Sequence, residues 1–181
     1  MNIAFYYYSD INPDRGGTER ITHFLAKSFE KEGYRCIYIA QISNGEDFEP
    51  SKPYQYFLPD SCQLSTEKNE LFCHKLFKEQ QIDVVINQDA MNVASSFFTK
   101  GRFPEVRIIS VLHFDMFGGC QHLVDAFKEQ YLKGKDSFSK YWIKRVFVSY
   151  YQRMARKSLC SLYRQLEVNS DYVVLLTQEA Y

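Results

Sequence analysis

The sequence of 181 residues lacks several features that mark common classes of protein. It has no run of about 18 apolar residues, so we expect no membrane-spanning segment. The amino terminus has neither a basic region nor a cleavable apolar core, which argues against a signal peptide. There is no excess of charge of either sign: 22 basic side chains balance 22 acidic ones, and the field of the whole chain does not favour nucleic acid.

Cysteines at metal-binding or redox spacing are also missing. The chain has five cysteines, an odd number, and none of them form a C-x-x-C pair. This scatter favours reduced thiols in a cytoplasmic protein over a disulfide framework or a zinc site. The five are Cys36, Cys62, Cys73, Cys120 and Cys160. Two phosphate-binding motifs are absent as well, the G-x-G-x-x-G fingerprint and the Walker A loop.

What the sequence does contain is a glycine doublet, Gly16-Gly17, between a strand pattern and a helix pattern. An apolar run at 3–8 precedes it, and apolar residues recur at helical spacing from about 18 to 32. The stripe predicted to be buried is Ile21, Phe24, Leu25 and Phe29. Gly33 stands where a glycine usually ends a helix.

The start of that helix predicts a binding site. Its first turn leaves backbone N–H groups unpaired, and the helix dipole adds positive charge there. Glycine lets a ligand approach the backbone closely, so the doublet suits a phosphate or a sugar hydroxyl. The pattern leaves open the alternative of a tight strand-to-helix turn that binds nothing.

Strand and helix patterns alternate along the rest of the chain. Further strands are predicted at 35–40, 54–58, 83–87, 107–112 and 172–176, and helices at 67–80 and around 93–98. In the helix at 67–80 the inward residues are predicted to be Leu71, Phe72, Leu76 and Phe77. The alternation favours a Rossmann-like, doubly wound and mainly parallel sheet with helices on both faces.

Polar residues follow two of the predicted strands. Gln88 and Asp89 come directly after the strand at 83–87, and His113 follows the strand at 107–112. Ligands of open α/β sheets bind beyond the carboxyl ends of the strands, which makes all three candidate binding residues. Loop polarity or helix capping would also explain Gln88 and Asp89, and a lone histidine is usually structural. His23 and His74 lie in helix patterns and are predicted at the surface.

Residues 128–164 differ from the rest of the chain. They contain ten basic residues against two acidic ones, interleaved with aromatic and apolar residues. Such a segment can lie on an anionic membrane surface. The alternative is a solvated basic face on a helix that packs on the core. A nucleic-acid role is not favoured, because no recognised motif accompanies the charge.

The string Gly16-Gly17-Thr18-Glu19-Arg20, with Leu25-Ala26 and Glu32-Gly33-Tyr34 after it, resembles the opening of family 4 glycosyltransferases of the GT-B fold. The resemblance is specific over the first forty residues and covers the rest in outline. It implies an enzyme that transfers a sugar from a nucleotide-diphosphate sugar to a glycan or lipid-linked acceptor, with retention. It implies no cofactor and no metal, in agreement with the absence of an Asp-x-Asp motif.

The resemblance also implies a domain assignment. Residues 1–181 correspond to the amino-terminal, acceptor-side domain, with a helical basic segment at 120–166. The carboxyl-terminal half, which carries a Glu-x7-Glu motif, is not in this sequence. We therefore expect a chain truncated before its donor-binding domain and inactive alone. Apart from the resemblance, the cysteines lead us to expect a cytoplasmic protein, and the basic segment leaves open a peripheral place at the inner face of the membrane.

In this family a histidine after the corresponding strand contacts the donor sugar, so the resemblance assigns the catalytic role to His113. The residues expected to bind donor or acceptor are Gly16, Gly17, Thr18, Glu19, Gln88 and Asp89. Two rival functions stay open. One is a nucleotide-sugar epimerase of the GT-B type, and the other is a non-catalytic, flavodoxin-like binding domain.

Overall fold

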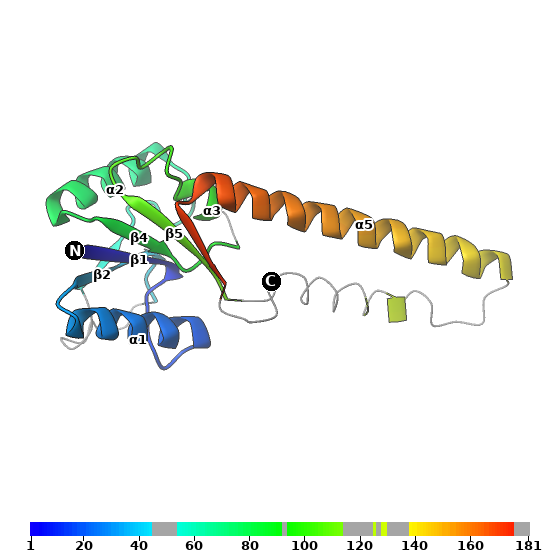
Figure 1. The fold of residues 1–181 in the computed structure, drawn as a ribbon, viewed down its shortest axis with the longest axis horizontal. Coiled ribbons are helices and arrows are strands. Elements are labelled where there is room, and N and C mark those ends of the chain that lie inside the picture. Colours follow the sequence, from blue (N-terminus) through cyan, green and yellow to red (C-terminus); the bar gives the residue numbers. More distant parts are fainter. Residues whose placement is uncertain (45–53, 92–93, 114–124, 126–127, 130–137, 176–181) are drawn as a thin grey trace. The chain divides into compact units, whose positions relative to one another are not determined.

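A computed structural model describes residues 1–44, 54–91, 94–113, 125, 128–129 and 138–175. Among the predicted features, Val93, Cys120 and much of 120–137 lie outside these residues. The chain divides into two compact units, which are described separately. The first comprises Met1–His113 and Leu166–Val174, and the second comprises Phe114–Gln165 and Leu175–Tyr181. Figure 1 shows the elements.

The centre of the fold is a six-stranded sheet. Its strands are β1 (Asn2–Ser9), β2 (Arg35–Ile42), β3 (Tyr54–Phe57), β4 (Val84–Asn87), β5 (Arg107–Leu112) and β6 (Tyr172–Leu175). They lie in the order β3-β2-β1-β4-β5-β6. β1 pairs in parallel with both β2 and β4, and the pairs β2/β3 and β4/β5 are also parallel. This confirms the predicted doubly wound sheet, whose strand order reverses between β1 and β4.

Helices cover both faces of the sheet (Figure 1). Helix α1 (Gly17–Lys31) lies on one face, and α2 (Glu67–Gln80) and α3 (Ala94–Phe97) lie on the other. Successive β1 residues point to opposite faces, so Ile3 and Phe5 join the core with α1, and Ala4 and Tyr6 join the core with α2 and α3. Both cores are apolar, which explains the continuous apolar runs in the central strands.

Helix α1 ends as Gly33 predicts. Gly33 has φ +84°, in the left-handed region that favours glycine. Its N–H donates to the Glu30 carbonyl at 3.0 Å, and the Tyr34 N–H donates to the Phe29 carbonyl at 3.0 Å. The rings of Phe29 and Tyr34 meet edge to face with their centroids 6.1 Å apart. These bonds and the ring contact form a Schellman motif that turns the chain into β2.

The predicted inward residues of the helices were partly wrong. Ile21 and Phe24 of α1 are 41% and 69% exposed, and Leu71 of α2 is 62% exposed. In α1 the residues facing the sheet are instead Thr22 and Ala26, with Leu25 and Phe29 beside them. In α2 the buried apolar residues are Cys73, Leu76 and Phe77, with Phe72 partly buried. Small inward residues let α1 lie close to the sheet. The spacing of large apolar residues alone does not reveal that this side of the helix faces inward.

The basic part of the chain includes the longest described helix, α5 (Phe138–Asn169). Its carboxyl end belongs to the first unit, where Leu166 is fully buried and the Asn169 carbonyl accepts the Lys100 N–H at 2.7 Å. The Asp171 N–H then donates to the Ile108 carbonyl at 2.8 Å, which brings β6 beside β5. Among the helices that the structure describes, none is long and apolar enough to cross a membrane.

Candidate functional site

The glycine doublet lies at the amino end of α1, beyond the carboxyl end of β1. Gly16 caps the helix in an extended conformation, and Gly17, Thr18 and Glu19 are its first three residues. The Arg20 N–H donates to the Gly16 carbonyl at 3.0 Å. The three N–H groups of Gly17, Thr18 and Glu19 have no hydrogen-bond partner among the described residues. The predicted set of unpaired donors is therefore present.

The two glycines have different surroundings. A Cβ on Gly16 would lie 2.5 Å from Glu19 Oε2, closer than real contacts allow. A Cβ on Gly17 would meet nothing within 4 Å. Gly16 thus makes room for the protein's own carboxylate, which is mostly buried against the turn. Gly17 leaves open space at the unpaired N–H groups.

Hydrogen bonds to neighbouring loops hold the segment before the doublet. Asp10 is buried, and its Oδ1 accepts from Arg15 Nη1 at 3.2 Å and from the Asn44 N–H at 3.1 Å. The Ile11 N–H donates to Gln55 Oε1 at 3.0 Å. These contacts fix the loop after β1 against the end of β2 and against β3. Sequence analysis did not single out Asp10 or Asn44, because their contact depends on the pairing of β1 with β2.

Tyr7 connects the glycine turn with the loop after β4. Burial raises the pKa of Tyr7, and the carboxylates of Glu19 and Asp89 raise it further. A hydrogen bond to the Thr18 side chain acts in the opposite direction. Tyr7 is thus hydrogen-bonded to Thr18 and lies within electrostatic range of Glu19 and Asp89. No pattern in the sequence indicates this role, since Tyr7 is one of several aromatic residues in a strand.

Gln88 and His113, predicted separately, are in direct contact. His113 Nε2 lies 2.6 Å from Gln88 Oε1. The amide oxygen only accepts, so the proton of the neutral imidazole is on Nε2, and Nδ1 is left as an acceptor. Burial lowers the pKa of His113 below its ordinary value, which keeps the ring neutral at pH 7. The contact follows from the adjacency of β4 and β5, in which Asn87 pairs with Ser110.

Three buried polar atoms at the carboxyl end of β4 and on the neighbouring part of β1 lack partners among the described residues. They are Tyr6 Oη, Asn87 Nδ2 and Gln88 Nε2. Gln88 is 2% exposed, and its backbone N–H donates to the Tyr6 carbonyl at 2.9 Å. A buried donor without a partner costs about 1–3 kcal/mol. This edge of the sheet is therefore unusually rich in unsatisfied polar groups.

The other histidines described are structural. His23 Nδ1 lies 3.1 Å from the Tyr38 hydroxyl, and His74 Nδ1 lies 2.5 Å from Glu105 Oε1. Both rings are half-buried, so the prediction of surface histidines was only partly right. Within the described ranges, no group of three or more His, Cys, Asp or Glu residues is placed to hold a metal ion.

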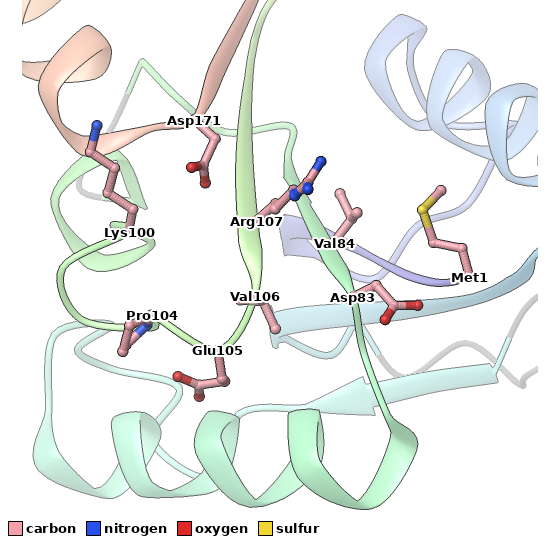
Figure 2. A pocket seen from close by; sticks show the side chains of 9 residues that line it. All are labelled: Met1, Asp83, Val84, Lys100, Pro104, Glu105, Val106, Arg107 and Asp171. Carbon is pink, nitrogen blue, oxygen red and sulfur yellow. The ribbon is translucent and has the colours of Figure 1, made fainter.

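A hollow in the described structure lies at the opposite end of the strands from the candidate site. It has a volume of about 780 Å³ and is lined by residues at the amino ends of β4, β5 and β6 (Figure 2). Two of its acidic groups accept backbone hydrogen bonds: Asp83 Oδ2 accepts the Asn2 N–H and Asp171 Oδ2 accepts the Ile108 N–H, each at 2.7 Å. The third, Glu105, pairs with His74. These bonds tie strand ends together, so we interpret this hollow as structural.

No protein-family model matches the chain, and no curated protein sequence matches it. Two of the solved structures that resemble it in fold are a galactosyltransferase and a dehydratase. The lipopolysaccharide outer core galactosyltransferase WaaB, in its apo form, is 19% identical, with 65% of this chain and 35% of that chain covered and a TM-score of 0.46. A dTDP-glucose 4,6-dehydratase from Bacillus anthracis, in complex with NAD, is 14% identical, with 97% and 53% covered and a TM-score of 0.42. At these scores the likeness concerns the fold alone.

Proposed function

We propose that this chain forms the acceptor-side half of a retaining, metal-independent glycosyltransferase of family 4 type. The intact enzyme would transfer a sugar from a nucleotide-diphosphate sugar to a glycan or lipid-linked acceptor. The observation that carries the proposal is the cluster of ligand-binding groups beyond β1, β4 and β5. It combines the open glycine turn with the Gln88–His113 pair, on the side of the sheet where doubly wound proteins bind ligands.

The charge at the glycine turn favours a sugar hydroxyl over a phosphate. Unpaired N–H groups alone would suit either ligand. The Glu19 carboxylate, however, lies against the same turn and would repel a phosphate. A hydroxyl can accept from the N–H of Gly17 or Thr18 and donate to a carboxylate. This combination supports an acceptor sugar at the turn, with the nucleotide diphosphate held mainly by the missing half.

His113 is suited to hold a second hydroxyl near the reacting centre. Its neutral ring offers Nδ1 as an acceptor, while Gln88 fixes the other nitrogen. A hydroxyl of the donor sugar can donate to Nδ1, which orients the sugar without adding charge. Catalysis also requires groups that bind the leaving nucleotide diphosphate. This chain alone is therefore expected to bind sugars weakly and to transfer none.

Binding can be tested on the chain itself. Nitrogen-15 NMR of the imidazole rings should show His113 in the Nε2–H tautomer, with its Nδ1 signal shifting as oligosaccharide acceptors are added. Gly17→Val should weaken acceptor binding by blocking the open side of the turn, while its thermal unfolding stays close to that of the wild type. Acceptors that leave both the His113 signal and the Gly17 amide unchanged would argue against the site.

The reaction is tested on the intact gene product. Gly17→Val and His113→Ala should each depress sugar transfer far more than stability, with EDTA without effect and the anomeric configuration retained. Wild-type rates in both variants would remove the assignment. Release of an epimerised sugar would point to the epimerase. A natural protein that ends near residue 181 would favour the flavodoxin-like binding domain.

A further inference from the structure

Asn44 stands directly before Gly45, and this is the single Asn-Gly pair in the sequence. An asparagine side chain can lose its amide when the backbone nitrogen of the next residue attacks Cγ. Glycine favours the attack, because it has no side chain in the way and its backbone turns freely. The pair therefore makes Asn44 the asparagine most susceptible to this reaction.

The reaction consumes only water. The Gly45 nitrogen bonds to Asn44 Cγ and gives up its proton, the C–N bond of the side-chain amide breaks, and the amide nitrogen leaves with that proton as ammonia. A water molecule then opens the cyclic imide at either of its carbonyls and returns a proton to the backbone nitrogen. The product is aspartate, or isoaspartate, in which the main chain runs through the former side chain. Either product carries one negative charge more than asparagine.

The position of Asn44 leaves it open to this chemistry. It is exposed and lies beyond the end of β2, so neither a helix nor a strand fixes its backbone. Asn169 differs, although a small residue also follows it. Ser170 is 3% exposed, and its N–H donates to the Leu166 carbonyl at 2.9 Å, which keeps that nitrogen from attacking.

The amide of Asn44 contributes to the construction of the candidate site. The Asn44 backbone N–H donates to Asp10 Oδ1 at 3.1 Å, and its Nδ2 donates to the same oxygen. Asp10 is 5% exposed and also accepts from Arg15 Nη1 at 3.2 Å. A neutral amide thus donates to a buried carboxylate and joins the end of β2 to the loop that leads to Gly16.

We infer that Asn44 deamidates in the folded protein and thereby releases the loop after β1 from the end of β2. The change removes the side-chain donor and brings a second negative charge against Asp10, which is costly beside a buried carboxylate. Arg15 can offset only one of the two charges. The released loop leads into the glycine turn, so the backbone donors of the turn lose their fixed position as the molecule ages.

Conversion is measured on the 181-residue chain. The folded protein is incubated at mildly alkaline pH, and mass spectrometry of its peptides follows the small mass gain that accompanies exchange of NH2 for OH. Asn44 should convert while Asn169 and Asn12 stay intact, the latter because Pro13 has no N–H to give up. Gly45→Val should slow the conversion, since a branched side chain hinders the attack.

The consequence of conversion is measured by urea unfolding. Asn44→Asp should raise the unfolding equilibrium constant at least about tenfold, because a hydrogen bond to a charged group is lost. The control is Asn12→Asp, which adds the same charge while its Oδ1 can still accept the Asp14 N–H, and it should change the constant less than about threefold. In an Asp10→Asn background the effect of Asn44→Asp should largely disappear.

Nitrogen-15 NMR should show the same shifts of the Gly16 and Gly17 amides in Asn44→Asp as in the aged protein. These tests involve no substrate and no turnover, so their outcome is independent of the proposed enzyme activity. Three results would overturn the inference. One is an Asn44 that stays intact in the folded chain while it converts in urea. Another is equal conversion at Asn169. The third is equal unfolding of Asn44→Asp and Asn12→Asp.

Discussion

The contrast between Gly16 and Gly17 gives the sharpest test of the site's construction. The perturbation is Gly16→Ala, with Gly17→Ala as the matched control one residue away. Gly16 is extended, with φ −155° and ψ 171°, so alanine adopts its backbone conformation without strain. Any cost must then come from the contact between the new Cβ and Glu19 Oε2, which would be 2.5 Å apart.

The size of the effect follows from what Glu19 must give up. Moving its carboxylate away from a preferred rotamer costs about 0.5–1.5 kcal/mol. Loss of its interaction with the helix amino end adds about 0.3–1 kcal/mol. Replacing glycine stabilises by about 0.4–1 kcal/mol through the unfolded chain. Gly16→Ala should therefore destabilise by about 1 kcal/mol, whereas Gly17→Ala should stabilise by about 0.4–1 kcal/mol.

A double-mutant cycle with Glu19→Ala isolates the contact. In the Glu19→Ala background the obstacle is absent, so Gly16→Ala should become stabilising like Gly17→Ala. Urea unfolding of the four proteins should give a coupling free energy of about 1–2 kcal/mol. Equal effects of Gly16→Ala and Gly17→Ala, or a coupling below about 0.3 kcal/mol, would refute the reasoning.

Three further predictions concern stability and reactivity. Burial lowers the pKa of folded His113, so its contribution to the free energy of unfolding is present above about pH 6.5 and is lost as the pH falls through the folded pKa. In urea unfolding, His113→Gln should reduce this loss of stability at low pH. Identical pH profiles of the variant and the wild type would contradict the prediction. Asn69→Ala should lower the free energy of unfolding by about 3 kcal/mol, because the buried amide forms hydrogen bonds with the backbone of Asp60 and Leu64. A loss below about 1 kcal/mol in urea unfolding would contradict this prediction. Burial raises the pKa of Cys36 to about 12, so iodoacetamide should label exposed Cys62 and spare Cys36 until unfolding, as peptide mass spectrometry would show.

The fold could be predicted closely because its signals are local. Apolar runs of strand length, separated by helical periodicity, indicated each of the six strands and the doubly wound arrangement. Gly33 marked the end of α1 because a left-handed residue there favours glycine. The prediction of which helix residues face inward was less accurate, since hydrophobicity alone suggested that Phe24 and Leu71 are buried. The residues buried in these helices instead include smaller ones, such as Ala26 and Cys73.

The candidate site was predictable residue by residue but not as a set of contacts. Gln88 and His113 each followed a strand, and this position alone made them candidates. Their hydrogen bond requires β4 and β5 to be neighbours in register, which no local pattern specifies. Asp10 and Tyr7 were missed for the same reason, because their roles depend on Asn44 and on Glu19 brought together by folding.

The same dependence on folding explains why two adjacent glycines have opposite roles. In the sequence Gly16 and Gly17 are equivalent members of a doublet, and both are predicted to belong to a ligand site. Folding brings Glu19 back over Gly16, one helical turn earlier, and leaves the space at Gly17 open. A carboxylate beside unpaired N–H groups offers an acceptor next to donors, and a hydroxyl needs both. In the function that we propose, Glu19 would therefore give the helix start a preference for sugars over phosphates, since a phosphate-binding turn would not place a carboxylate there.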